Sequence, residues 1–88
     1  MSETLVSPAD VHEAAGEFRR ASKDLQKLVN HLDKTMDGLQ GRWQSSTQQL
    51  FYRDYKLWQQ QSLGLAQILS NISRELEAMA QRFAAADQ

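Results

Sequence analysis

The sequence predicts an all-α fold, an antiparallel two-helix hairpin that dimerises into a four-helix bundle. Two long segments have apolar residues at helical spacing, a glycine-containing break separates them near mid-chain, and no segment shows the alternation typical of a strand. The chain has 88 residues and no cysteine, so we expect one domain over residues 1–88 without disulfides. Because a lone hairpin of this size buries a small core, pairing with another chain is the expected source of stability.

The first helix is expected over about residues 8–40. Ser7 precedes Pro8, the only proline, and Asp10 follows three residues after Ser7. These residues suit a cap, a first helical position and the positive end of the helix dipole. Apolar residues then repeat every seven positions from Val11 and form one broad stripe with their neighbours. The residues of this stripe that we expect to pack within the hairpin or the dimer include Phe18, Leu25, Leu28 and Leu32.

The second helix is expected over about residues 46–86, after a turn at about 41–45. Gly41 suits the residue just past a helix end, and Ser45 or Ser46 could cap the next helix because each has a glutamine three residues later. Apolar residues then step by four and three, which is a heptad pattern. The packing residues expected here are Phe51, Tyr55, Trp58, Leu65, Leu69, Ile72 and Leu76, with Ile68 in a second row.

The charge distribution excludes some partners and favours another helical chain. Ten basic and 11 acidic residues alternate along the chain without a basic stripe, so nucleic acid is not expected as a partner. No apolar run approaches the roughly 20 residues of a membrane span, and the N-terminus lacks the features of a secretory signal peptide. Residues 57–73 contain no charge, which indicates an interface with another chain, although an uncharged surface rich in glutamine and serine is the alternative.

The sequence contains no constellation typical of an enzyme, a metal site or a cofactor site. His12 and His31 are far apart on one predicted helix, and neither has further ligands at helical spacing. The hydroxyl residues beside the turn lack a neighbouring base that could activate a nucleophile. We therefore expect no catalytic, metal-binding or cofactor-binding residues, and a function that depends on protein–protein interaction.

The turn resembles that of the WXG family, small early-secreted-antigen-like proteins named for Trp-x-Gly. The matching residues are Leu39, Gly41 and Trp43, followed by Phe51 and Trp58 in the second helix. The resemblance covers essentially the whole chain, and the length and the central turn also fit. One position departs from the family pattern, because Ser45 stands where the family has glycine. A small residue that suits a helix start could do the same local job.

The resemblance implies a small virulence-factor-like substrate or adaptor that a type VII (ESX-type) secretion system exports as a folded dimer. The implied partners are a second copy or a sister family member, and a secretion ATPase of the FtsK/SpoIIIE type. The protein would be made in the cytoplasm and secreted without a cleaved signal peptide. Leu39, Gly41, Trp43 and Ser45 would form the turn motif for export. Phe83 and Asp87 would correspond to the family's C-terminal export signal, Tyr-x-x-x-Asp/Glu, with phenylalanine in place of tyrosine.

Two interpretations remain open for the C-terminus, and two for the function of the protein. Phe83 and Asp87 lie four positions apart on one helical face, but Phe83 also continues the apolar heptad pattern. The alternative function is a cytosolic helical dimerisation or adaptor module that is not exported. Trp43 and the aromatic–acid tail favour export, since a cytosolic bundle gains little from either.

Overall fold

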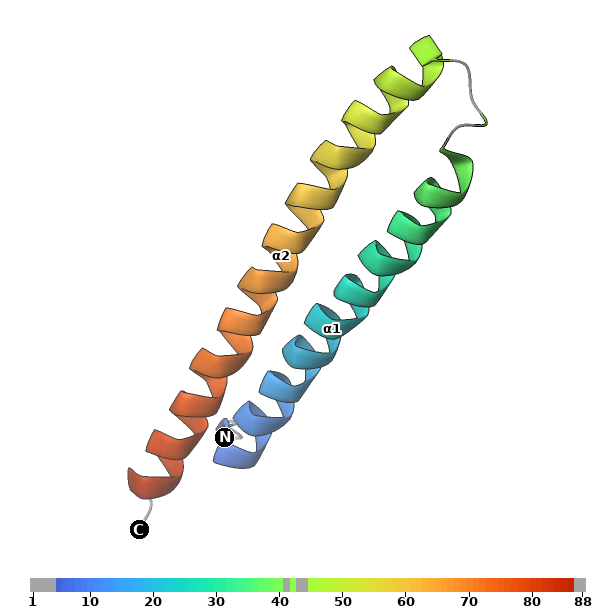
Figure 1. The fold of residues 1–88 in the computed structure, drawn as a ribbon. Helices are drawn as coiled ribbons and strands as arrows, with labels where there is room; N and C mark the ends of the chain where they lie inside the picture. The colour runs from blue at the N-terminus through green and yellow to red at the C-terminus, as the bar shows by residue number, and fades with distance from the viewer. Residues whose placement is uncertain (1–4, 41, 43–44, 87–88) are drawn as a thin grey trace.

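The computed structural model describes residues 5–40, 42 and 45–86, and within them the chain forms an antiparallel hairpin of two helices (Figure 1). Helix α1 spans Pro8–Leu39 and helix α2 spans Ser45–Ala86. The described residues contain no strand, so the predicted all-α hairpin is confirmed. No helix in this part of the chain is both long and apolar enough to cross a membrane.

The start of α1 forms as the sequence predicts. The Asp10 N–H donates to the Ser7 hydroxyl oxygen over 3.1 Å, and the Ser7 N–H donates to the Asp10 carboxylate over 3.1 Å. This capping box satisfies backbone donors that the first turn of a helix otherwise leaves unpaired. Pro8 follows in the first turn, where its missing N–H costs nothing.

The start of α2 differs from the expectation that Ser45 or Ser46 precedes the helix as its cap. The helix already includes both serines, so Ser46 lies inside its first turn. The residue that precedes the helix, and Gly41 in the expected turn, lie outside the described residues.

The most deeply buried side chains between α1 and α2 are small, whereas the large apolar ones are only partly buried or exposed. Most of the buried residues repeat every seven positions on each helix, and a small side chain lets two backbones approach closely. The residues with this spacing are Ala15, Ser22 and Val29 on α1, and Ala66, Ser73 and Ala80 on α2, while Val11, Gly16 and Ser62 are also buried. We call the six residues with this spacing the small-residue seam.

Two buried serines fix the register of the seam. The Ser22 hydroxyl donates to the Ala66 carbonyl, and the Ser73 hydroxyl donates to the Ala15 carbonyl, each over 2.7 Å. Ser22 and Ser73 are only 2% and 5% exposed, so a register shift would leave buried hydroxyls unpaired. The two bonds are reciprocal and hold the helices at two points seven residues apart.

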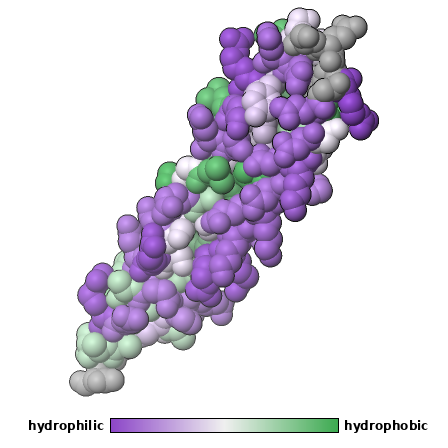
Figure 2. Space-filling view, viewed as in Figure 1, coloured by the Kyte–Doolittle hydropathy of each residue, from purple (hydrophilic) through white to green (hydrophobic). Residues whose placement is uncertain are grey.

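Large apolar side chains remain accessible because the seam uses small ones. Leu28, Leu57, Leu65 and Ile68 are all exposed in the hairpin. Figure 2 shows one side of the molecule, which is mostly hydrophilic with hydrophobic patches between the polar side chains. The hairpin therefore has apolar surface that its own core does not use, and such surface commonly marks an interaction site.

Candidate functional site

The candidate functional site is one face of the hairpin, on which apolar side chains of both helices lie together. Phe18 and Ala21 of α1 line a shallow hollow with Leu69 of α2 and Glu17. Helical periodicity places the other large apolar residues of each helix on the same side of the seam. This apolar face comprises Phe18, Ala21, Leu25, Leu28 and Leu32 of α1 and Trp58, Leu65, Ile68, Leu69, Ile72 and Leu76 of α2.

Most predicted packing residues lie on this face, and the structure divides them by exposure. Leu28, Leu65 and Ile68 are exposed, as is Phe51 nearer the turn. The partly buried members cover the edges of the seam and are also accessible from outside: Phe18, Leu25, Leu32, Trp58, Leu69, Ile72 and Leu76. A side chain at such a position can contact its own hairpin and a second chain at once.

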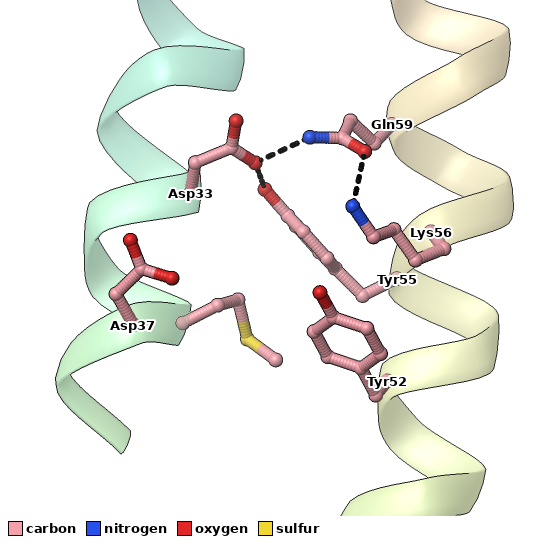
Figure 3. A pocket seen from close by; sticks show the side chains of 7 residues that line it. Asp33, Asp37, Tyr52, Tyr55, Lys56 and Gln59 are labelled. Atoms are coloured by element: carbon pink, nitrogen blue, oxygen red, sulfur yellow. Dashed lines mark hydrogen bonds between the residues drawn. The ribbon is translucent and has the colours of Figure 1, made fainter. Parts of the chain in front are cut away.

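Away from the apolar face and near the turn, the hairpin contains a hydrogen-bonded network centred on Asp33 (Figure 3). The Tyr55 hydroxyl donates to Asp33 Oδ1, and Gln59 Nε2 donates to the same oxygen over 2.8 Å. Lys56 Nζ donates to Gln59 Oε1 over 3.3 Å and lies 5.5 Å from the centre of the Tyr52 ring. The network joins α1 to α2 where the sequence suggested only apolar packing for Tyr55.

Tyr55 connects this network to the apolar face. Its ring lies 5.7 Å from the Trp58 ring, centre to centre, while its hydroxyl reaches Asp33. Burial and the hydrogen bond to the Asp33 carboxylate raise the pKa of Tyr55 to about 12. The hydroxyl therefore stays protonated, and stays a donor to Asp33, far above neutral pH.

Removing the Tyr55 hydroxyl tests the energetic contribution of this network. We expect Tyr55→Phe to destabilise the protein by about 1.5–3 kcal/mol, because a hydrogen bond to a charged acceptor is lost while the ring packing remains. Tyr52→Phe is the matched control, since the Tyr52 ring lies on the surface beside Lys56. Thermal unfolding followed by circular dichroism compares the two variants, and an equal loss in both would contradict a special role for Tyr55.

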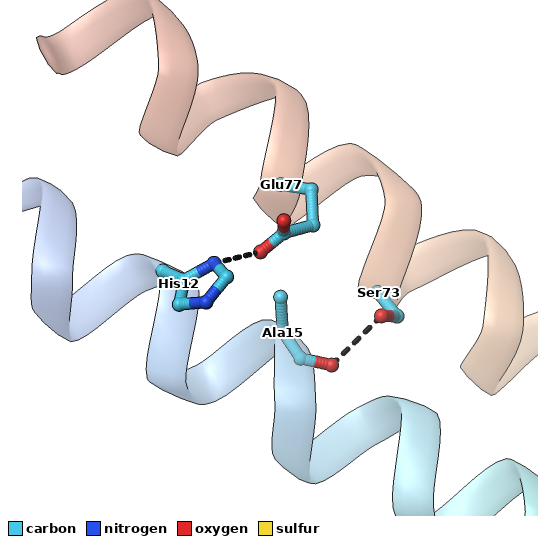
Figure 4. Close-up of polar contacts among 4 residues, drawn as sticks. All are labelled: His12, Ala15, Ser73 and Glu77. Carbon is cyan, nitrogen blue, oxygen red and sulfur yellow. Dashed lines mark hydrogen bonds and ion pairs between the residues drawn. The ribbon is translucent and has the colours of Figure 1, made fainter.

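A second polar contact joins the helices near the free end of the hairpin (Figure 4). His12 Nδ1 lies 2.5 Å from Glu77 Oε1, next to the Ser73–Ala15 hydrogen bond. The His12 side chain is exposed, as is His31 farther along α1. Within the part of the chain that the structure describes, no group of three His, Cys, Asp or Glu residues could hold a metal ion.

The predicted export residues lie at the two ends of α2, and several fall outside the described residues. Leu39 ends α1 and Ser45 begins α2, whereas Gly41, Trp43 and Asp87 are not described. Phe83 is 42% exposed in the last turns of α2. Ala80 is the last buried residue, and the helix then runs past the start of α1 (Figure 1). Residues 81–86, all exposed, form what we call the α2 overhang.

The small-residue seam and the Asp33 network are not among the features that the sequence predicted. The sequence does contain a pattern for the seam, because small residues recur every seven positions on each helix. The large apolar residues recur with the same period. We assigned hairpin packing to the largest side chains, as is usual for an amphipathic helix. The Asp33 network had no comparable signal, because its partners lie 22 and 26 residues away from Asp33.

Comparisons with known proteins agree with this architecture. The sequence model of the WXG100 family, described as proteins of 100 residues with WXG, matches residues 4–88. The crystal structure of a secreted protein EsxB from Bacillus anthracis matches with a TM-score of 0.90 and 28% sequence identity, covering 100% of both chains. The wild-type form of the same protein, in space group P21, gives a TM-score of 0.87 and 28% sequence identity, covering 96% of this chain and 97% of that chain. None of the curated proteins matches this chain.

The large apolar side chains of the hairpin stay accessible beside a seam of small ones. These features define a class of small helical hairpins that associate with other helices. The chain belongs to the WXG100 family, since the family model covers residues 4–88. The resemblance found in the sequence is thereby confirmed. Members of this family related to EsxB are small, helical and dimeric, and bundles of two hairpins are typical of them.

Proposed function

We propose that this protein is a small substrate or adaptor that a type VII (ESX-type) secretion system exports as a folded dimer, without a cleaved signal peptide. The family membership over residues 4–88 carries the proposal, and the likeness to a secreted protein supports it. The exported protein would act by protein–protein interaction.

Folding as a dimer is supported by the balance between buried and exposed apolar surface. The buried apolar residues of the hairpin are two valines and three alanines, with Val29 the largest fully buried one. The leucines and isoleucines of the apolar face stay partly or fully exposed. A second hairpin that covers this face would supply most of the missing hydrophobic stabilisation, at roughly 25 cal/mol per Å² of apolar surface. The partner would be a second copy or a sister family member.

Recognition by the secretion machinery would use the two ends of α2. We assign the turn residues Leu39, Gly41, Trp43 and Ser45 to one signal, and Phe83 with Asp87 to the other. The α2 overhang supports the second assignment, because the exposed side chains of residues 81–86 are accessible for docking. The proposed receptor is a secretion ATPase of the FtsK/SpoIIIE type.

The two tryptophans provide a test of the turn signal. We expect Trp43→Ala to reduce the secreted amount strongly with a small change in melting temperature, because Trp43 falls between the two apolar heptad patterns of the sequence. Trp58→Ala is the matched control. It should lower the melting temperature strongly and change the secreted amount less, since Trp58 is part of the apolar face and contacts Tyr55. A large-to-small change at a packed tryptophan costs about 3–5 kcal/mol.

Secreted amount and melting temperature are measured for both variants. If Trp43→Ala unfolds the protein while export of the remaining folded fraction is normal, then Trp43 is a structural residue and the turn signal is wrong.

A further inference from the structure

The side of α2 that points away from α1 carries apolar side chains that do not belong to the apolar face. Helix α1 lies along one side of α2 (Figure 1), and Ala66 is buried in that contact. Leu57 precedes Ala66 by nine residues, which corresponds to a rotation of about 180° around the helix. Leu57 is 56% exposed, and Leu50, seven residues earlier, is 61% exposed. This outward side stays accessible when a second hairpin covers the apolar face.

The residues on the outward side are arranged symmetrically about Gly64. They lie seven, eleven and fourteen positions before and after Gly64, which is close to two, three and four helical turns, so they share one side of α2. Arg53 and Glu75 are the pair at eleven positions, and their charges are opposite. We call these residues the outer row: Leu50, Arg53, Leu57, Gly64, Asn71, Glu75 and Ala78.

Gly64 leaves the middle of the outer row without a side chain. It is exposed, and no atom lies within 4 Å of the position that a Cβ would take. Packing within the hairpin therefore does not require glycine here, although glycine destabilises a helix interior relative to alanine. The distance between two packed helices depends on the side chains at their contact, so Gly64 lets another helix approach closely.

The charges of the outer row suit a second copy that runs antiparallel. A twofold axis at Gly64 places each residue opposite the one at the same distance on the other side of Gly64. Arg53 then lies opposite Glu75 of the partner subunit. Asp54 and Arg74, each ten positions from Gly64, repeat this opposition beside the row. A parallel copy would instead place like charges together, so the charge pattern favours the antiparallel direction.

The two charges of the outer row are available to a partner. In the part of the chain that the structure describes, the ion pairs are His12–Glu77 and Glu17–Arg20, and neither includes Arg53 or Glu75. Both of these side chains are exposed. Residues 57–73, between the two charges, carry no charge that would be desolvated by close contact.

From these observations we infer that two dimers of this protein associate through the outer rows of their α2 helices, antiparallel, with Gly64 at the crossing point. The contact uses a surface separate from the apolar face. The inference rests on the proposed function only in that the associating unit is a dimer. It goes further, because export of a dimer does not need this contact.

Filling the crossing point tests the inference with the full-length chain. Wild type should exceed the mass of a dimer as the protein concentration rises, as measured by light scattering coupled to size exclusion and by sedimentation velocity. Gly64→Leu should remain a dimer, with association between dimers weakened on the order of 100-fold, because two leucines would collide at the crossing point. The helix itself should tolerate the change, since a Cβ at Gly64 meets no atom of the hairpin.

Gly38→Leu is the matched control for this variant. Gly38 is also an exposed helical glycine with no atom within 4 Å of a Cβ, but it lies on α1. It should therefore associate as wild type does.

Charge reversal tests the antiparallel register. Arg53→Glu should weaken association between dimers about tenfold, because two contacts between opposite charges become contacts between like charges. Combining Arg53→Glu with Glu75→Arg restores opposite charges in both contacts and should recover the association of wild type. Added salt should weaken the wild-type contact, since exposed charges are screened.

Each outcome decides the inference. A wild-type protein that never exceeds the mass of a dimer would overturn it and leave export untouched, because assembly is measured on purified protein and export in cells. Gly64→Leu that assembles as wild type does would also overturn it. Monomeric Gly64→Leu would mean that the outer row forms the dimer itself, which contradicts an assembly of dimers. Equal association of the single and double charge variants would contradict the register at Gly64.

Covalent trapping gives an independent measurement, because the chain has no natural cysteine. Gly64→Cys should form an intermolecular disulfide under mild oxidation, since the two sulfur atoms would meet at the crossing point. Gly38→Cys should remain uncross-linked on a non-reducing gel. Equal cross-linking of both variants would contradict the proposed contact.

Discussion

Leu69→Asp is expected to dissociate the dimer and to destabilise the protein by about 3 kcal/mol. Leu69 lies at the edge of the seam, where it lines a hollow with Phe18 and Ala21. A carboxylate there would have no basic partner in the hollow, and Glu17 lies beside it with the same charge. Covering the apolar face would then bury an unpaired charge, which is among the most unfavourable changes in a core.

Leu63→Asp is the matched control for this prediction. It introduces the same group at an exposed leucine outside the apolar face. Circular dichroism melting and light scattering are measured for both variants. An unchanged melting temperature and mass for Leu69→Asp would show that the apolar face is assigned to the wrong side of α2.

Deletion of Phe83–Gln88 is expected to leave a helical dimer that remains inside the cell. Residues 81–86 are exposed and extend past α1, so removal of this end costs little packing. The exposed helix end carries an aromatic side chain, which can supply contact area to a receptor. Secreted and cellular amounts are compared for the truncated and full-length chains, with melting temperature as the measure of folding.

Point changes separate the two parts of the proposed tail signal. Asp87→Ala should reduce export with almost no change in melting temperature. Phe83→Tyr should be tolerated, because the family's usual aromatic at this place is tyrosine. Normal export of the truncated chain would mean that the resemblance of the tail to the family signal is accidental.

The hairpin and the start of α1 could be predicted from sequence because they depend on local signals. Helical periodicity, Pro8 and the Ser7–Asp10 spacing act over a few residues, and the structure contains the capping box that they predict. The family could be recognised for a similar reason, since the motif around the turn has a fixed order and spacing.

Packing between the helices was harder to predict because it depends on which side of each helix faces the other. Large apolar residues and small residues follow the same seven-residue rhythm on α2, so periodicity does not decide between Leu65 and Ala66 as the contact residue. The close approach of the helices at Ser22 and Ser73 decides it, and this approach is a property of the pair. The Asp33–Tyr55 contact likewise depends on the register, which no single segment encodes.

The most direct test of the account is immunoblotting of culture supernatant from cells with and without the secretion ATPase. If the protein is exported by this route, the full-length protein appears in the supernatant at its unprocessed mass when the ATPase is present, and is retained in the cells when the ATPase is deleted. A cytosolic marker protein in the same samples excludes release by lysis. Equal amounts of the protein in both supernatants would contradict export by this route. Retention of all the protein inside the cells even when the ATPase is active would also contradict it and would favour a cytosolic dimerisation module.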